Sequence, residues 1–116
     1  MTQELLAEKL RQFAEARDWD QFHTPKNLAI ALATETAELL ELFQWTRGTR
    51  DWGDLDEPGI RQRVEEELAD VLLYLIRFAD KAGIDLQAAA IRKLDVNATK
   101  YPVEKSKGSD SKYTEL

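Results

Sequence analysis

The chain has 116 residues, no cysteine, one histidine, and a formal net charge of −6 from 22 acidic and 16 basic side chains. Its length suits one domain with a small hydrophobic core, and its acidity argues against a nucleic-acid-binding surface, which would be basic. The shortage of cysteine and histidine argues against zinc, and the apolar runs are too short to span a membrane. The first residues lack the charged-then-apolar order of a signal peptide, so we expect a cytoplasmic protein.

Helix caps and helix breakers divide the chain into four predicted helices. Thr24 followed by Pro25 is typical of a helix start, and Gly83 is typical of a helix end. The predicted helices cover residues 3–17, 25–44, 59–82 and 86–99. Residues 46–59 are dense in Gly, Asp and Pro and predict a loop that reverses the chain direction. Because no strand pattern is evident, we predict an all-α bundle of about four helices.

The end of the chain differs in composition from the predicted bundle. Pro102 stops the last helix, and the residues after it include few apolar side chains. We therefore expect one helical domain over residues 1–102, followed by a mobile polar tail over residues 103–116.

Four acidic residues occupy positions where the predicted helices should be apolar. Leu, Val and Ala recur every three or four positions along residues 25–44 and 59–82, as on the inward face of a helix. Two acids interrupt this face in each helix: Glu35, Glu38, Glu67 and Asp70. Buried carboxylates that converge repel one another or take up protons. A bound cation would remove that cost, so we predict a metal site between the two helices.

The ligand type indicates which cation is expected. Oxygen donors without thiolate or imidazole suit Mg²⁺, with Mn²⁺ as a substitute. A di-iron bundle would pair glutamates with Glu-x-x-His motifs, which the sequence lacks. The alternative is that the acids form a solvated helix face, the commonest reason for such spacing in an acidic chain. Solvated faces are however evident elsewhere, for example at Arg61, Arg63 and Glu65.

Aromatic side chains flank the predicted metal site. Trp19 and Trp45 fall at helix ends, and Tyr74 follows Asp70 by one helical turn. Such rings could stack on a nucleobase, a contact worth about 1 to 3 kcal/mol. The alternative is that these rings belong to a satellite hydrophobic core.

Polar side chains on the last helix offer a further binding surface. Lys93, Asn97 and Lys100 recur at steps of four and three, a stripe able to reach phosphate oxygens. A solvated stripe is equally consistent with this spacing. The single histidine, His23, lies in a connection, where it is either a surface residue or a ligand-binding one.

The ordered motifs of the chain resemble a known family. They are RDW, QFHTPKNL, ETAELLELFQW, EELADVLLYL, KLDVNATKYP and the ending KYTEL. This combination covers nearly the whole chain and is similar to the MazG-like all-α nucleoside triphosphate pyrophosphohydrolases, especially their dCTP pyrophosphatase branch.

The resemblance implies a fold, an assembly and a reaction. It implies a helical subunit that forms a homotetramer as a dimer of dimers, with Mg²⁺ held by Glu35, Glu38, Glu67 and Asp70. The implied reaction cleaves a deoxynucleoside triphosphate between its α and β phosphates, giving the monophosphate and pyrophosphate. Either Glu38 or Glu41 would orient or deprotonate the attacking water.

The resemblance also assigns substrate contacts. Those around the base and sugar would be Trp19, His23, Trp45 and Tyr74, and those to phosphate or sugar would be Lys93, Asn97 and Lys100. The resemblance also implies a histidine on the first helix at the position that Arg11 occupies in this chain. Arg11 could change the base preference or bind phosphate.

Two other functions remain open from the sequence. A sibling enzyme that prefers dUTP or damaged nucleotides would share every metal ligand and differ only in the pocket. A non-catalytic helical module would use exposed acids to bind a basic partner and would not respond to Mg²⁺.

Overall fold

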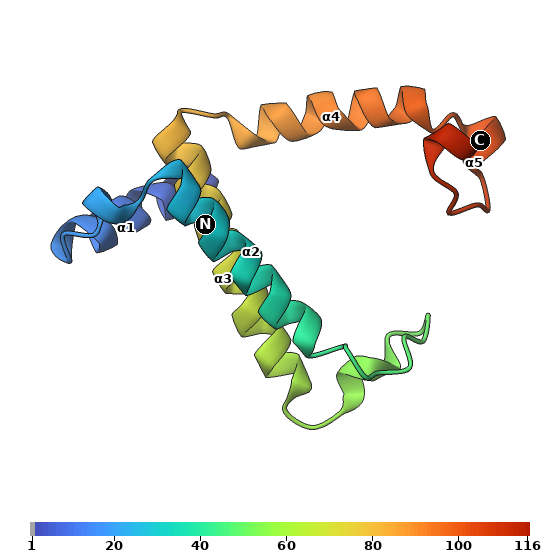
Figure 1. The fold of residues 1–116 in the computed structure, drawn as a ribbon, viewed down its shortest axis with the longest axis horizontal. Coiled ribbons are helices and arrows are strands. Elements are labelled where there is room, and N and C mark those ends of the chain that lie inside the picture. The colour runs from blue at the N-terminus through green and yellow to red at the C-terminus, as the bar shows by residue number, and fades with distance from the viewer. Residues whose placement is uncertain (1) are drawn as a thin grey trace. The chain divides into compact units, whose positions relative to one another are not determined.

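The computed structural model describes residues 2–116, which are helical or irregular and include no strand. The predicted all-α class is therefore confirmed for this part of the chain. The fold consists of two compact units, one ending at Ala82 and the other beginning at Gly83 (Figure 1). Over residues 2–116, no helix combines the length and the apolar character needed to cross a lipid bilayer.

The first unit contains three long helices. They are α1 (Gln3–Ala16), α2 (Pro25–Glu41) and α3 (Ile60–Ala82), with short 3₁₀ turns η1 (Asp20–Phe22) and η2 (Gly53–Asp56) in the connections. Helices α2 and α3 lie side by side as an antiparallel hairpin, and α1 packs against α3 (Figure 1). The hairpin brings together the two acidic segments that the sequence separates.

The helix boundaries follow local side-chain chemistry. The hydroxyl of Thr24 accepts a hydrogen bond from the backbone N–H of Asn27 at 3.1 Å, and Pro25 begins α2. Gly83 adopts a left-handed φ of 69°, which ends α3 at little steric cost. The Asp85 carboxylate then accepts a hydrogen bond from the backbone N–H of Ala88 at 3.0 Å, where the next helix begins.

The predicted inward face of the hairpin is confirmed, although few side chains on it are fully buried. Leu28 is 2% exposed and Ile60 is 7% exposed, and most positions between them on the seam are half-buried. Glu35, Glu67 and Asp70 are half-buried as well, whereas Glu38 is exposed. Three of the four acids therefore lie in the hydrophobic seam.

The second unit contains α4 (Leu86–Lys100), the short helix α5 (Val103–Ser106) and the 3₁₀ turn η3 (Tyr113–Glu115). The rings of Tyr101 and Tyr113 meet edge to face at 5.9 Å, and the Lys100 ammonium lies 4.8 Å from the Tyr113 ring centre. Residues 103–116 thus include ordered turns, while their mobility and the single domain over residues 1–102 stay predictions.

Replacing Thr24 by alanine should lower the free energy of unfolding by about 1 kcal/mol, because the first turn of α2 loses its side-chain cap. Chemical denaturation measures this change. Thr34→Ala is the matched control, since the Thr34 hydroxyl bonds only to the Ile30 carbonyl within the same helix, and we expect an effect within about 0.5 kcal/mol. Equal losses in both variants would contradict the role given to the cap.

Candidate functional site

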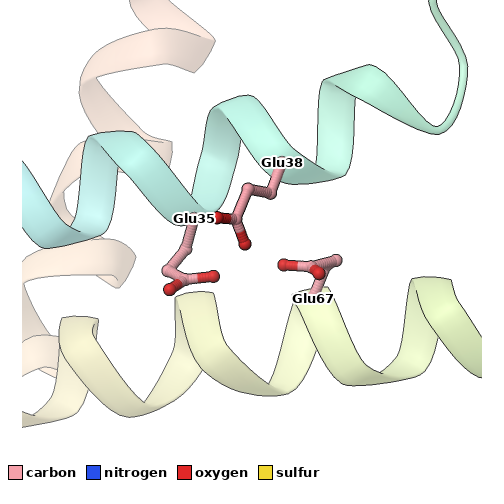
Figure 2. A group of neighbouring side chains, drawn as sticks. All are labelled: Glu35, Glu38 and Glu67. Carbon is pink, nitrogen blue, oxygen red and sulfur yellow. The ribbon is translucent and has the colours of Figure 1, made fainter.

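Three glutamates from two helices point into the space between α2 and α3. Glu35 and Glu38 lie one turn apart on α2, and Glu67 faces them from α3 (Figure 2). One carboxylate oxygen from each residue lies within 4.8 Å of the other two. We call these residues the three-glutamate cluster. A single cation could contact all three side chains at this spacing.

Burial leaves this cluster electrostatically unsatisfied. The Oε2 atoms of Glu35 and Glu67 are buried and have no hydrogen-bond partner. Burial, together with the closeness of Glu38 and Asp70, raises the pKa of Glu35 to about 7. Burial and the closeness of Glu38 also raise the pKa of Glu67. Both shifts mean that the protein disfavours the ionised carboxylates in the absence of a positive charge.

The cluster fits a hard divalent cation. All its donors are carboxylate oxygens, two of them lack any partner, and their mutual repulsion would be relieved by positive charge. Asp70 is not one of the three mutually close acids, but its charge raises the pKa of both Glu35 and Glu67. Its predicted role as a fourth metal ligand stays a prediction.

An aromatic pocket of about 300 Å³ adjoins Asp70. Trp19, His23 and Tyr74 line it together with Asp70, so the structure gathers three of the four side chains predicted to surround a base. The Trp19 ring packs edge to face against Phe13, with ring centres 5.7 Å apart. Apolar walls with a few polar groups are typical of small-molecule sites.

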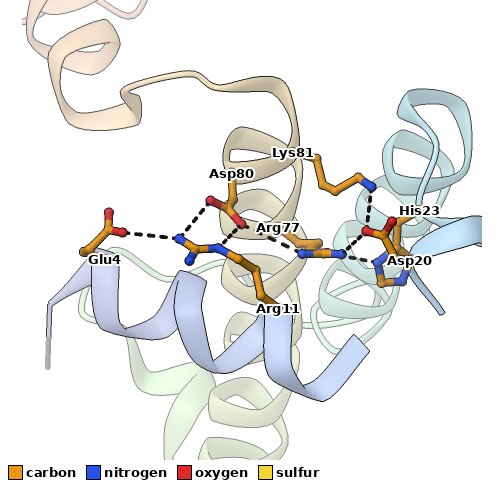
Figure 3. A network of polar contacts seen from close by, with 7 residues as sticks. All are labelled: Glu4, Arg11, Asp20, His23, Arg77, Asp80 and Lys81. Carbon is orange, nitrogen blue, oxygen red and sulfur yellow. Dashed lines mark hydrogen bonds and ion pairs between the residues drawn. The ribbon is translucent and has the colours of Figure 1, made fainter. Parts of the chain in front are cut away.

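The structure places Arg11 outside this pocket. Its Nε donates to a carboxylate oxygen of Asp80 at 2.8 Å, and its terminal nitrogen donates to Glu4 at 3.2 Å (Figure 3). Leu10 lines the pocket instead, because adjacent residues on a helix point about 100° apart. Arg11 thus links α1 to α3, and the neighbouring residue that faces the pocket is apolar. The expected contact of Arg11 with the substrate stays a prediction.

Two other predicted site residues of the first unit, Trp45 and Glu41, do not line the pocket. Trp45, just beyond α2, is 89% exposed. Glu41, the last residue of α2, is exposed and lies outside the three-glutamate cluster. The phosphate contacts expected from α4 belong to the second unit, and their role stays a prediction; they are Lys93, Asn97 and Lys100.

Sequence reasoning missed one charged residue in the pocket. Arg77 on α3 lines the pocket although it is only 5% exposed. It donates to His23 at 3.0 Å and to Asp20 at 2.8 Å, and Lys81 also donates to Asp20, at 2.6 Å (Figure 3). The available signal was an arginine inside the apolar run LLYLIRFA. A buried guanidinium needs several hydrogen-bond acceptors. The acids close to Arg77 in the sequence could not provide all of these acceptors, so partners from elsewhere in the chain were required.

The fold and the site together define a class: helical proteins whose antiparallel α2–α3 hairpin carries a carboxylate cluster beside an aromatic pocket. A model of the "MazG-like family" matches residues 30–116. The chain belongs to the MazG-like family.

Named relatives and a solved structure agree with this assignment. The chain is 48% identical over 105 residues to dCTP pyrophosphatase 1 of Mus musculus and 44% identical over 109 residues to that of Homo sapiens. In both cases the match covers 90% of this chain and 62% of the relative. The crystal structure of a pyrophosphatase from Archaeoglobus fulgidus superimposes with a TM-score of 0.78 at 46% identity, covering 85% of this chain and 91% of that one.

We expect the cation-free protein to be destabilised by Glu35 as the pH rises. Its pKa is about 7 in the folded chain against an ordinary value of 4.5, so the folded state holds this proton more tightly than the unfolded state. The resulting stabilisation is complete below about pH 4.5 and is lost as the pH rises through about 7. Denaturation of the wild type and Glu35→Gln across this range, with a chelator present, measures the difference.

The same experiment with added Mg²⁺ or Mn²⁺ tests the cation site. Above pH 7, either ion should raise the melting temperature of the wild type more than that of Glu35→Gln. In the samples with chelator and no added cation, a wild type that gains stability relative to Glu35→Gln between pH 4.5 and 7 would contradict the raised pKa of Glu35.

Proposed function

We propose that this protein hydrolyses deoxynucleoside triphosphates, with dCTP or a modified dCTP preferred, to the monophosphate and pyrophosphate in a Mg²⁺-dependent reaction that controls the nucleotide pool. The observation that carries the proposal is the three-glutamate cluster beside the pocket of Trp19, His23 and Tyr74. The relatives named dCTP pyrophosphatase 1 support the choice of substrate. The chain spans about 62% of the length of those relatives.

The metal would be held by Glu35, Glu38 and Glu67, with Asp70 beside them. When bound, Mg²⁺ supplies positive charge for the triphosphate oxygens and lowers the pKa of a coordinated water. Glu38, the most exposed member of the cluster, would orient or deprotonate the attacking water. Glu41 is the alternative base, although its place at the end of α2 separates it from the cluster.

The pocket residues would hold the nucleoside. Trp19 and Tyr74 offer ring faces for stacking, and the Asp70 carboxylate offers a hydrogen-bond acceptor near both the pocket and the cluster. This arrangement supports a base in the pocket with its phosphates directed toward the cluster. The phosphate or sugar contacts expected of Lys93, Asn97 and Lys100 stay a prediction.

The two competing functions differ in what they require. A sibling enzyme for dUTP or damaged nucleotides requires the same cluster and only a different pattern of hydrogen bonds in the pocket. A non-catalytic module that binds a basic partner requires exposed, fully ionised acids. Half-buried Glu35 and Glu67, both with raised pKa values, favour an enzyme over such a module.

We also propose that the protein self-associates, as a homotetramer built from two dimers. Large apolar side chains remain exposed on the hairpin, including Leu40 at 66%, Leu68 at 51% and Leu72 at 45%. Trp45 at 89% exposure is a further unpartnered aromatic. Exposed apolar area of this kind is typical of interfaces. A cytoplasmic location and the lack of nucleic-acid polymer partners stay predictions.

Turnover with each of several deoxynucleoside triphosphates and Mg²⁺ tests the reaction. We expect pyrophosphate rather than orthophosphate, and Glu38→Gln should lower kcat by about 100-fold or more, as when a group that stabilises transition-state charge is lost. Glu65→Gln, an equal change at an exposed position of α3, is the matched control. Release of orthophosphate, or equal activity in both variants, would overturn the proposal.

Sedimentation velocity tests the assembly. The wild type should sediment as a species larger than one chain, and Leu72→Glu should shift it toward smaller species, because a charge would be buried at the interface. Arg63→Glu, an exposed position on the same helix, should leave the assembly unchanged. A wild type that is monomeric at micromolar concentration refutes the assembly without affecting the proposed reaction.

A further inference from the structure

The strongest unexplained feature is the contact between Arg77 and His23 inside the pocket. Arg77 Nε donates to His23 Nδ1 at 3.0 Å, and its terminal nitrogen donates to Asp20 at 2.8 Å (Figure 3). Arg77 comes from α3 and His23 follows η1, so the contact joins segments 54 residues apart. Both side chains line the pocket that also contains Trp19 and Tyr74.

The chemistry of the donor fixes the proton on the histidine ring. Arginine stays protonated in proteins and its nitrogens only donate hydrogen bonds. His23 Nδ1 must therefore accept, and the single proton of the neutral ring must lie on Nε2. With Nδ1 engaged, Nε2–H is the polar group of this ring that remains for a ligand, and it is a donor.

The surroundings keep this arrangement in place. Arg77 is 5% exposed, and its other nitrogens are held by Asp20 and, at 3.8 Å, by Asp80. Lys81 also pairs with Asp20 at 2.6 Å. Burial and then the positive charges of Arg77 and Lys81 lower the pKa of His23, while Asp20 acts in the opposite direction. These surroundings thus favour the neutral form of the ring.

We propose that Arg77 is a positioning residue that holds His23 as the neutral Nε2–H tautomer, so that His23 presents a hydrogen-bond donor to an acceptor atom of the bound nucleoside. The acceptor would be a carbonyl oxygen or ring nitrogen of the base, or a sugar oxygen. The ligand part of this inference rests on the proposed function, whereas the tautomer and its cause do not.

Nitrogen-15 NMR of the full chain tests the tautomer directly, because His23 is the single histidine and its imidazole signals are unambiguous. In the protein alone we expect a protonated Nε2, an unprotonated Nδ1, and a scalar coupling between Arg77 Nε and His23 Nδ1 across the hydrogen bond. A proton on Nδ1, or no such coupling, would overturn the proposal without the need for any variant.

A matched pair of variants tests the cause. Arg77→Met keeps the aliphatic stem and removes the guanidinium, so His23 should become a mixture of tautomers and its protonation midpoint should rise. Arg11→Met makes the same change in the same polar network without touching His23, and should leave the imidazole signals unchanged. Identical His23 spectra in wild type and Arg77→Met would contradict the positioning role.

The α,β-imido analogue of dCTP, added with Mg²⁺, tests the ligand part. Its binding should shift the Nε2–H signal of the wild type, and Arg77→Met should bind it roughly fivefold to tenfold more weakly, as for the loss of one well-oriented hydrogen bond. Binding that leaves Nε2–H unshifted contradicts the donor role of His23. If the Arg77–His23 scalar coupling is present but the analogue does not bind, the proposed function is contradicted. If the protein hydrolyses its substrate but the coupling is absent, only the Arg77 proposal is contradicted.

Discussion

The repulsion among carboxylates between α2 and α3 is the constraint on which the rest of this structure depends. Helix packing normally brings apolar side chains together, but this hairpin closes over Glu35 and Glu67, whose buried oxygens have no hydrogen-bond partner. Such an arrangement opposes the folding of the cation-free chain. In the cation-free chain the hydrophobic seam, which includes Leu28 and Ile60, must offset that penalty, and a bound cation would relieve it. The proposed function and the stability of the fold therefore depend on the same pair of helices.

Charge is divided along α3, with acidic side chains in its middle and basic side chains near its end. The acids Glu67 and Asp70 occupy its middle, while Arg77 and Lys81 lie two to four turns further on, where they bind Asp20. The pocket lies between these groups, because Asp70 and Arg77 both line it. A cation site at one side and a neutral histidine donor at the other would give the pocket two chemically different ends.

The sequence predicted the elements that depend on local signals. Caps such as Thr24 and breaks such as Gly83 act within one turn, and the three-to-four periodicity identified the seam and its acids. The sequence did not show that Leu10 rather than Arg11 lines the pocket, because one residue changes the direction of a helical side chain by about 100°. Arg77 was missed because its partners, Asp20 and His23, lie more than 50 residues away in the chain. Interactions across such separations cannot be inferred from spacing alone.

The raised pKa of Glu35 links the cluster to proton exchange with the solvent. With its pKa raised to about 7, this carboxyl takes up or releases a proton near neutral pH in the cation-free chain. A metal ligand must be deprotonated, so a cation that bound to the cluster would expel this proton. The apparent affinity for such a cation would therefore increase with pH around neutrality, and the heat of its binding would depend on the ionisation enthalpy of the buffer that takes up the proton.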